Sequence, residues 1–478
     1  MRSPDSRFRS PKNNIIATTD DNPYVLRPDA IQEPPQTLGG TLSKLGPGFI
    51  LSAAIVGSGE LIATTTLGAR AGFITFWVII LSCLVKVTLQ LEFGKHAIYS
   101  GETVMAAFNR LPGLRLRGTN WTIWTWLFIQ IFKLLQVGGI VGGVALTLNI
   151  AFPAVSTTIW AFVSAILASL LIFQGYYRFI EKFAIVMIGL FTLLTFASLF
   201  FLQYTPYALS WENVLMGLQF QLPTSAVVIA LGAFGITGVG GDEIMYYNYW
   251  CIEKGYARFT GPRLDDPHPD SSHSANEEGW LRRAKGWIKV MYWDALLSMV
   301  VYTIVTAVFY LLGAAILHES GDIPEGYQMV EALSRIYTET LGPNAKSVFL
   351  LGALVVLFST LFAALASWTR IFSDCFGQIG WINFYDPQIR RRSIAVLAWV
   401  FPLAWTLLFL FIQLPVAMIL IGGFVTSILL LIIVFAAYQF RYHRLPKALS
   451  PSLGYDIAFW ISSVVIFLIG LYSIVKFF

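Results

Sequence analysis

The chain has 478 residues, of which 56% are hydrophobic and only 12% are charged, and its formal net charge at pH 7 is +5. Soluble domains carry roughly 25% charged residues, so this composition excludes an ordinary soluble protein and indicates an integral membrane protein. Three cysteines are too few for a disulfide framework or a thiolate metal site, and the small net charge gives no support for nucleic-acid binding.

Hydrophobic segments recur along the whole chain. A segment of about 20 apolar residues can cross a hydrocarbon core of about 30 Å as a helix. The sequence therefore predicts an all-α, multi-pass membrane protein with eleven transmembrane helices, at 46–69, 72–94, 123–149, 156–174, 182–203, 224–250, 290–316, 345–370, 393–412, 415–438 and 456–476.

The polar segments predict the orientation. Residues 1–45 are polar and proline-rich, which is typical of a disordered tail. Lys and Arg collect in this tail and in alternate loops, so the positive-inside rule places the N-terminus in the cytoplasm. An odd number of spans then places the C-terminus outside, and we expect the protein in the plasma or bacterial inner membrane.

Two of the predicted spans are interrupted by glycines followed by acidic residues. The motif VGSGEL covers residues 56–61, and VGGDEI covers residues 239–244. A break at mid-membrane is tolerated only where the backbone is buried in protein or lines a watery cavity. Alignment of the motifs pairs Gly57 with Gly240, Ser58 with Gly241 and Glu60 with Glu243.

The first and sixth spans cross the membrane in opposite directions because they are five spans apart. This pattern predicts two inverted five-helix repeats with discontinuous helices 1 and 6 and a substrate site between them. The repeats would cover 46–203 and 204–440, and residues 441–478 would supply a loop and the eleventh helix. The alternative is that both kinks serve only close helix packing.

Several stretches resemble a known family in the same order along the chain. LGPGFILSAAIVGSGELIATTTLGARAGF is similar to the first span of the Nramp (natural resistance-associated macrophage protein) family of divalent-metal transporters. Further landmarks are FWVIILSCLVKVTLQ, ALTLNIAF, GYYRFIEKF, VLMGLQFQLP and RRRSIAVLAWVFP. The resemblance covers about residues 44–440. It implies a LeuT-like fold and secondary active transport of a small ion, by a protein that is not an enzyme and holds no cofactor.

The metal-binding motifs of that family are absent from this chain. Gly57 stands where the family has the Asp of Asp-Pro-Gly-Asn, and Glu60 stands where it has the Asn. The stretch GVGGDEI replaces the Met-Pro-His motif of the sixth span. The resemblance therefore describes the fold far better than the substrate.

The two breaks supply the candidate substrate site. We expect it to contain Gly57, Ser58, Glu60, Gly240, Gly241, Asp242 and Glu243. Glu60, Asp242 and Glu243 are the candidate metal ligands, because hard carboxylate oxygens suit Mg²⁺, Mn²⁺ or Ca²⁺. The alternative is that each carboxylate caps the free N–H groups of the half-helix that it begins. The aromatic stretch MYYNYW that follows is assigned to an interfacial belt.

Two lysines complicate a metal site. Lys86 and Lys133, the latter near Gln136, lie inside predicted spans, where an unpaired ammonium costs several kcal/mol. We expect each lysine to face a carboxylate and assign Lys86, Lys133 and Gln136 a coupling or charge-compensating role; the alternative is that the lysines snorkel to an interface. If they neutralise the carboxylates, a small anion such as bicarbonate becomes the alternative substrate.

The sequence thus predicts a monomeric secondary transporter whose partners are the transported ion and the lipid bilayer. A divalent cation of the Mg²⁺ or Mn²⁺ kind is the first expectation for that ion. A small anion carried by an Nramp-related protein with a changed substrate is the alternative.

Overall fold

The computed structural model describes residues 22–48, 57–173, 177–263 and 271–477. Its first half contains a short antiparallel hairpin, β1 (Arg115–Leu116) and β2 (Thr119–Asn120), between helices. The helices up to the second break are η2 (Pro28–Ala30), α1 (Leu38–Lys44), η3 (Gly59–Thr64), α3 (Thr65–Ala71), η4 (Gly72–Thr75), α4 (Phe76–Val85), α5 (Val87–Ser100), α6 (Val104–Asn109), α7 (Trp121–Ala151), α8 (Thr157–Phe173), α9 (Tyr177–Leu202), α10 (Trp211–Met216), η5 (Thr224–Ala226) and α11 (Val227–Ile236).

The second half is also helical. Its helices are α12 (Gly241–Lys254), α13 (Tyr256–Thr260), α14 (Ser271–Leu312), η6 (Gly313–Leu317), α15 (His318–Ser320), η7 (Gly326–Gln328), α16 (Met329–Leu341), α17 (Ala345–Ile379), α18 (Pro387–Ile412), α19 (Pro415–Gln439), η8 (Phe440–Arg444), η9 (Lys447–Leu449) and α20 (Leu453–Phe477). Within the described residues each of the eleven predicted spans lies mainly on helix, and the span 224–250 is interrupted at residues 237–240.

The apolar helices have the dimensions that a bilayer requires. Eight helical segments within the described residues are long and apolar enough to span a membrane, and α8 and part of α9 are shorter apolar helices. One of the eight, Gly59–Ser100, contains two predicted spans. Gly72, with φ of +62°, ends α3. Helix α3 packs against α14 and η6, and the returning α4 and α5 pack against α14. The predicted all-α membrane fold is therefore confirmed, although 49–56 in the first span lie outside the described residues.

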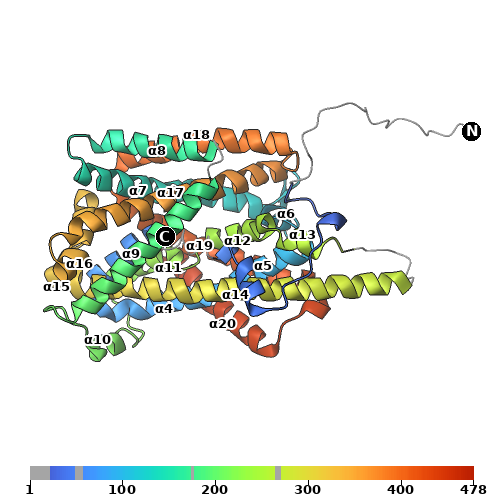
Figure 1. Cartoon of the computed structure of the whole chain (residues 1–478), viewed down its shortest axis with the longest axis horizontal. Coiled ribbons are helices and arrows are strands. Elements are labelled where there is room, and N and C mark those ends of the chain that lie inside the picture. Colours follow the sequence, from blue (N-terminus) through green and yellow to red (C-terminus); the bar gives the residue numbers. More distant parts are fainter. Residues whose placement is uncertain (1–21, 49–56, 174–176, 264–270, 478) are drawn as a thin grey trace, which may run out of the picture.

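The broken helices lie inside the bundle. Figure 1 shows α8 and α18 along one side, α14 and α20 along the other, and α11, α12 and α19 between them. The central helix α19 packs against α7, α11 and α20. The residues on either side of the second break are thus enclosed by helices from both halves of the sequence.

Glycines allow α11 and α19 to approach closely. A Cβ atom added to Gly235 would lie 1.8 Å from the carbonyl oxygen of Gly423, and one added to Gly423 would lie 2.2 Å from the carbonyl oxygen of Gly232. Ser427 of α19 also donates a hydrogen bond of 2.9 Å to the carbonyl of Leu231. Small residues at such crossings let two backbones pack directly, which is a common way to join helices within a membrane.

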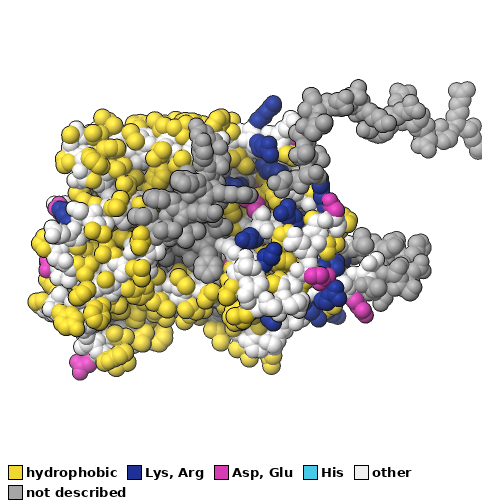
Figure 2. Space-filling view, in the orientation of Figure 1, with side chains coloured by type: hydrophobic (Ala, Val, Ile, Leu, Met, Phe, Trp, Pro, Cys, Tyr) yellow, Lys and Arg dark blue, Asp and Glu magenta, His cyan; other side chains and the backbone are white. Residues whose placement is uncertain are grey.

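The surface separates an apolar belt from a charged end. In Figure 2, hydrophobic side chains cover most of the visible face, and Lys and Arg gather at the end formed by α6, α13 and the beginning of α14. We call this the basic end. An apolar belt with a cationic border fits a protein that lies across a bilayer with its basic end in water.

The domain boundaries drawn from the sequence stay predictions. Residues 1–21 of the predicted tail lie outside the described residues. In the following part, Tyr24 is buried and its hydroxyl donates a hydrogen bond of 2.5 Å to Glu253 Oε1 on α12.

Candidate substrate site between two helix breaks

The second break separates α11 from α12. Between Ile236 and Gly241 the backbone leaves the helical region: Thr237 has ψ of 140°, Gly238 has φ of +63° and Gly240 has ψ of 175°. Gly238 requires glycine, both for this positive φ and because an added Cβ would lie 3.1 Å from Cys83 Cα. The predicted interruption of the sixth span is therefore present and fully buried.

The first predicted break lies partly outside the described residues, which resume at Gly57. There η3 has the wide π-helical hydrogen-bond pattern, which is rare and is often found at functional sites. All six residues of η3, including Glu60, are buried.

The Glu60 carboxylate joins the two breaks. Its Oε1 accepts a hydrogen bond of 3.3 Å from the N–H of Gly238 and one of 3.1 Å from the hydroxyl of Thr306 on α14. Its Oε2 accepts from the N–H of Gly57 at 3.5 Å. These donors lie at both breaks and on a third helix, so the geometry favours the capping alternative for Glu60.

A small cavity lies beside the breaks. Its volume is about 60 Å³, and both polar and apolar side chains line it. Its lining comes from η3, α7, the second break, α12 and α17: Ser58, Gly59, Lys133, Gln136, Val137, Ile140, Ile236, Gly238, Asp242, Glu243, Tyr246, Trp250, Thr360, Ala363, Ala364, Ser367 and Trp368.

The cavity brings together half of the residues predicted for the site. Ser58, Lys133, Gln136, Asp242 and Glu243 line it. The other predicted residues are not part of its lining and lie at the breaks or behind them: Gly57, Glu60, Lys86, Gly240 and Gly241.

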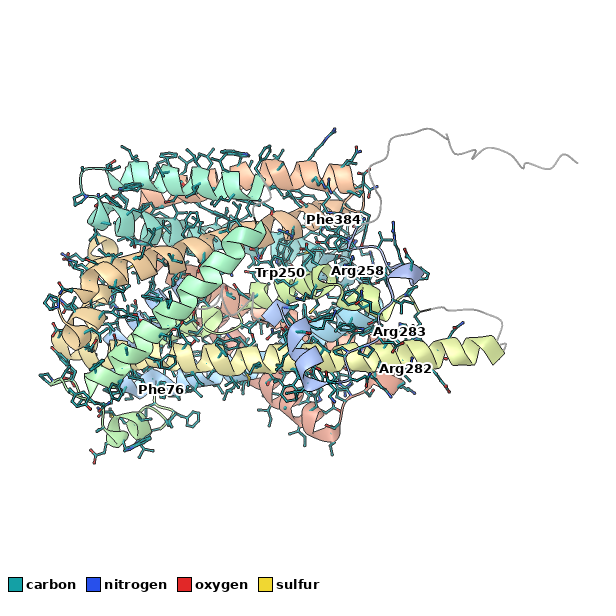
Figure 3. The ribbon with its side chains drawn as sticks, in the orientation of Figure 1. Phe76, Trp250, Arg258, Arg282, Arg283 and Phe384 are labelled. Atoms are coloured by element: carbon teal, nitrogen blue, oxygen red, sulfur yellow. The ribbon has the colours of Figure 1, made fainter. Side chains whose placement is uncertain are left out.

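Several residues that line the cavity were not predicted from the sequence. Tyr246 and Trp250, assigned to an interfacial belt, are buried and face the cavity instead; Figure 3 marks Trp250 on α12. Their spacing of four residues places them on one face of α12 with Asp242, a signal that was available in the sequence. Thr360, Ser367 and Trp368 come from α17, and no pattern in the sequence connects that helix with the breaks.

Lys133 is paired inside the cavity. Its ammonium forms an ion pair with Asp242 Oδ2, and Gln130 Nε2 donates a hydrogen bond of 2.9 Å to Asp242 Oδ1. Lys133 is 4% exposed and Asp242 1% exposed. The expected carboxylate partner is therefore present, and the geometry does not favour snorkelling.

Lys86 has a different kind of partner. Its ammonium donates hydrogen bonds of 2.7 Å to the carbonyl of Phe234 and 2.6 Å to the carbonyl of Thr237. We expected a carboxylate at this lysine, but the contacts show main-chain oxygens at the end of α11. Because Lys86 bonds main-chain carbonyls, it forms no ion pair that would neutralise the carboxylates of the cavity.

Glu243 is the cavity carboxylate left for a ligand. It lies in the first turn of α12 and is partly exposed. Within the described ranges, no side chain forms an ion pair with Glu243 or donates a hydrogen bond to it. Glu60, with which the motif alignment pairs it, accepts hydrogen bonds from Gly57, Gly238 and Thr306, so the two carboxylates differ in what they can still bind.

A metal at this cavity would rely on few protein ligands. In the part of the chain that the structure describes, no group of three or more His, Cys, Asp or Glu side chains is placed to hold a metal ion. Asp242 and Glu243 could supply carboxylate oxygens, and Ser58, Thr360 and Ser367 hydroxyl oxygens. This donor set is hard and lacks sulfur and imidazole.

The fold and the cavity define a class of protein. A helix broken within its span beside a buried cavity, in a bundle of membrane-spanning length, fits the arrangement of LeuT-fold secondary transporters. A family model described as "Natural resistance-associated macrophage protein-like" matches residues 48–476. The chain therefore belongs to the Nramp family, whose members are transporters and not enzymes.

Sequence relatives are distant. The chain is 24% identical over 336 residues to an uncharacterized protein of Pasteurella multocida, with coverage of 68% of this chain and 69% of that protein. It is also 24% identical over 354 residues to the divalent metal cation transporter MntH of Xylella fastidiosa, with coverage of 73% and 66%. The chain thus spans about two thirds of the length of these relatives.

Solved structures confirm the fold. A variant of the Eremococcus coleocola manganese transporter matches with a TM-score of 0.63 at 16% identity, over 96% of this chain and 90% of that one. MhsT in complex with L-phenylalanine matches with a TM-score of 0.52 at 15% identity, over 92% and 100%. At such identities the likeness is one of fold alone.

Proposed function

We propose that this protein is a secondary active transporter that carries a divalent cation of the Mg²⁺ or Mn²⁺ kind through the cavity beside its two helix breaks. The observation that carries the proposal is the position of Glu243, a carboxylate at the start of a half-helix that faces the cavity without a side-chain partner among the described residues. The sequence relative named as a divalent metal cation transporter supports the same class of cargo.

The donor set favours a hard ion that keeps part of its water. Mg²⁺ is commonly bound through one or two carboxylates while several waters stay on the metal. A cavity of about 60 Å³, lined by two acidic side chains and by three Ser or Thr side chains, has room for an ion with a few waters, since one water needs roughly 10–15 Å³ of such space. The lack of sulfur and imidazole ligands in the lining disfavours softer transition metals.

The breaks supply the moving parts of the mechanism. Half-helices that meet at a non-helical segment can tilt while the remaining helices stay packed, which opens the cavity to each side in turn. With the basic end in the cytoplasm, as the positive-inside rule requires, Asp242 and Glu243 lie at the inner half-helix α12. We place this carrier in the plasma membrane as a monomer.

The proposal is tested by uptake into proteoliposomes. Wild-type protein should give saturable uptake of Mg²⁺ and Mn²⁺, read by trapped metal-sensitive dyes. Glu243→Gln should reduce it roughly ten-fold or more, since even the loss of a residue that only supports a metal ligand typically costs about 10- to 100-fold in affinity. Glu319→Gln, which removes an exposed carboxylate from α15, is the matched control. Uptake by Glu243→Gln at the wild-type rate would refute the site.

One observation favours a second candidate, a small anion. Lys133 lines the same cavity and could bind a bicarbonate ion if it were released from Asp242. In that case Lys133→Met should abolish uptake of labelled bicarbonate, while Glu243→Gln should leave it intact. For a metal carrier, Glu243→Gln should instead reduce the uptake of Mg²⁺ and Mn²⁺, so this variant separates the two substrates.

A further inference from the structure

The end of α11 is a cluster of carbonyl oxygens. The last carbonyls of any helix have no partner within the helix, and they carry the negative end of its dipole. Here Phe234 and Thr237 direct their carbonyls toward α4, where the hydroxyl of Ser82 lies 2.9 Å from the first and 3.0 Å from the second. In hydrocarbon such a cluster requires donors or a cation.

The ammonium of Lys86 occupies this cluster. It bonds both carbonyls, lies 5.1 Å from the centre of the Phe234 ring and is 0% exposed. Lys86 is the residue between α4 and α5, so its stem enters from the junction of two helices of the first repeat. Within the described residues, no Asp or Glu side chain forms an ion pair with Lys86; the acids pair with other cations.

In LeuT-fold carriers, unwound carbonyls and the C-terminal ends of half-helices are the groups that coordinate a coupling cation. We propose that the Lys86 ammonium is a built-in cation in a carbonyl-lined site of this kind, a site that takes a small free monovalent cation, such as an alkylammonium or sodium ion, once the lysine is removed. The wild-type break then keeps its charge balance without any bound monovalent ion.

This inference rests on the proposed transport function, but the binding of a small monovalent cation in place of Lys86 does not depend on which ion is transported. Lys86 is absent from the cavity lining, whereas Glu243 and Lys133 belong to it. A tethered cation cannot leave with the substrate. The carrier should therefore work equally well in sodium, potassium or choline media.

The decisive experiment is chemical rescue of Lys86→Ala, read by the thermal unfolding of the purified protein in detergent. Lys86→Ala should unfold several degrees below the wild type in choline chloride. Methylammonium chloride at the same concentration should restore most of that loss, because methylammonium fits where the lysine head was. The melting temperature of the wild type should be the same in both salts.

Lys86→Met is the matched variant. The methionine side chain occupies the space of the lysine stem but has no ammonium. The Lys86→Met protein should therefore be destabilised and should respond much less to methylammonium. Equal melting temperatures for Lys86→Ala and the wild type, or equal responses of Lys86→Ala to choline and methylammonium, would overturn the proposal.

A measurement on the wild type covers the case in which neither variant folds. Mn²⁺ uptake should have the same rate in sodium, potassium and choline media, and a saturable requirement for sodium would overturn the proposal. If the wild type carries neither Mg²⁺ nor Mn²⁺, the proposed substrate fails, while a methylammonium-specific rescue of Lys86→Ala would still support the built-in cation.

Discussion

Glu60 and Glu243 occupy equivalent positions in the two broken segments and have different surroundings. Glu60 is 0% exposed and accepts hydrogen bonds from Gly57, Gly238 and Thr306. Glu243 is partly exposed and lines the cavity. A carboxylate surrounded by protein donors is already solvated by the protein, whereas one that faces a cavity is open to a ligand. Two acids that the motif alignment pairs therefore differ in what they can bind because their neighbours differ.

The largest effect should come from Glu60→Ala. It leaves the buried N–H groups of Gly57 and Gly238 without this acceptor, whereas the Thr306 hydroxyl keeps the carbonyl of Tyr302, so we expect a loss of roughly 3 kcal/mol or more in the free energy of unfolding. Denaturation in mixed detergent micelles measures this loss. Glu60→Gln, which keeps one acceptor oxygen, should lose less. A stable, active Glu60→Ala protein would show that the bridge between the breaks is dispensable.

The next effect concerns Lys133, which neutralises Asp242 and leaves Glu243 as the open acid. Lys133→Met buries an unpaired carboxylate, which we expect to destabilise the protein by roughly 2 kcal/mol, less than for a sealed ion pair because the cavity is partly open. Added Mn²⁺ should then raise the melting temperature more than in the wild type. The double variant with Asp242→Asn should recover part of the loss, and strict additivity in this cycle would mean that the two residues do not interact.

Glu243→Gln should separate stability from function. It removes a carboxylate that has no side-chain partner among the residues described, so the free energy of unfolding should change by less than about 1 kcal/mol. The stabilisation by Mn²⁺ should disappear in the same variant. If Glu243→Gln were as destabilised as Glu60→Ala, the contrast between the two acids would be false.

The smallest effect concerns Glu102, an acid outside the spanning segments. Burial raises the pKa of its carboxyl, but the hydrogen bond with His96 and the cations of Arg110 and Arg444 outweigh burial and hold the pKa below the ordinary value of 4.5. A lowered pKa stabilises the fold above the unfolded-state value, and this stabilisation is lost as the pH falls through the folded-state value.

Below about pH 4.5 the wild type should therefore lose stability that Glu102→Gln does not lose. Solvent screening limits the difference to about 1 kcal/mol or less. Melting temperatures of both proteins between pH 3 and 7, an interval that brackets the ordinary pKa of Glu, provide the test. Parallel curves would remove Glu102 as the cause of acid sensitivity.

The fold was accessible from the sequence because its signals are local. Apolar length predicts the spans, and glycines followed by acids predict the two interruptions. The Nramp resemblance rested on landmarks spread over the chain, and the family match to residues 48–476 confirms it.

The roles of individual side chains were not accessible in the same way. Lys86 bonds carbonyls 148 and 151 residues away, and the hydroxyl that helps to saturate Glu60 comes from a helix 246 residues further along. Sequence spacing could not tell a carbonyl partner from a carboxylate partner for a buried lysine. It also could not connect Thr360 or Trp368 of α17 with the breaks, because only tertiary packing places them there.

The direct backbone contact between α11 and α19 has a consequence for how this family can diversify. Gly232, Gly235 and Gly423 leave no room for a side chain, so these two helices form one rigid frame. Apart from Ile236, the residues that line the cavity lie outside this frame, and Asp242 and Glu243 among them belong to α12. Selection can therefore exchange Asp242, Glu243 and their neighbours and produce a carrier for a different cargo, while the scaffold that holds the site keeps its shape.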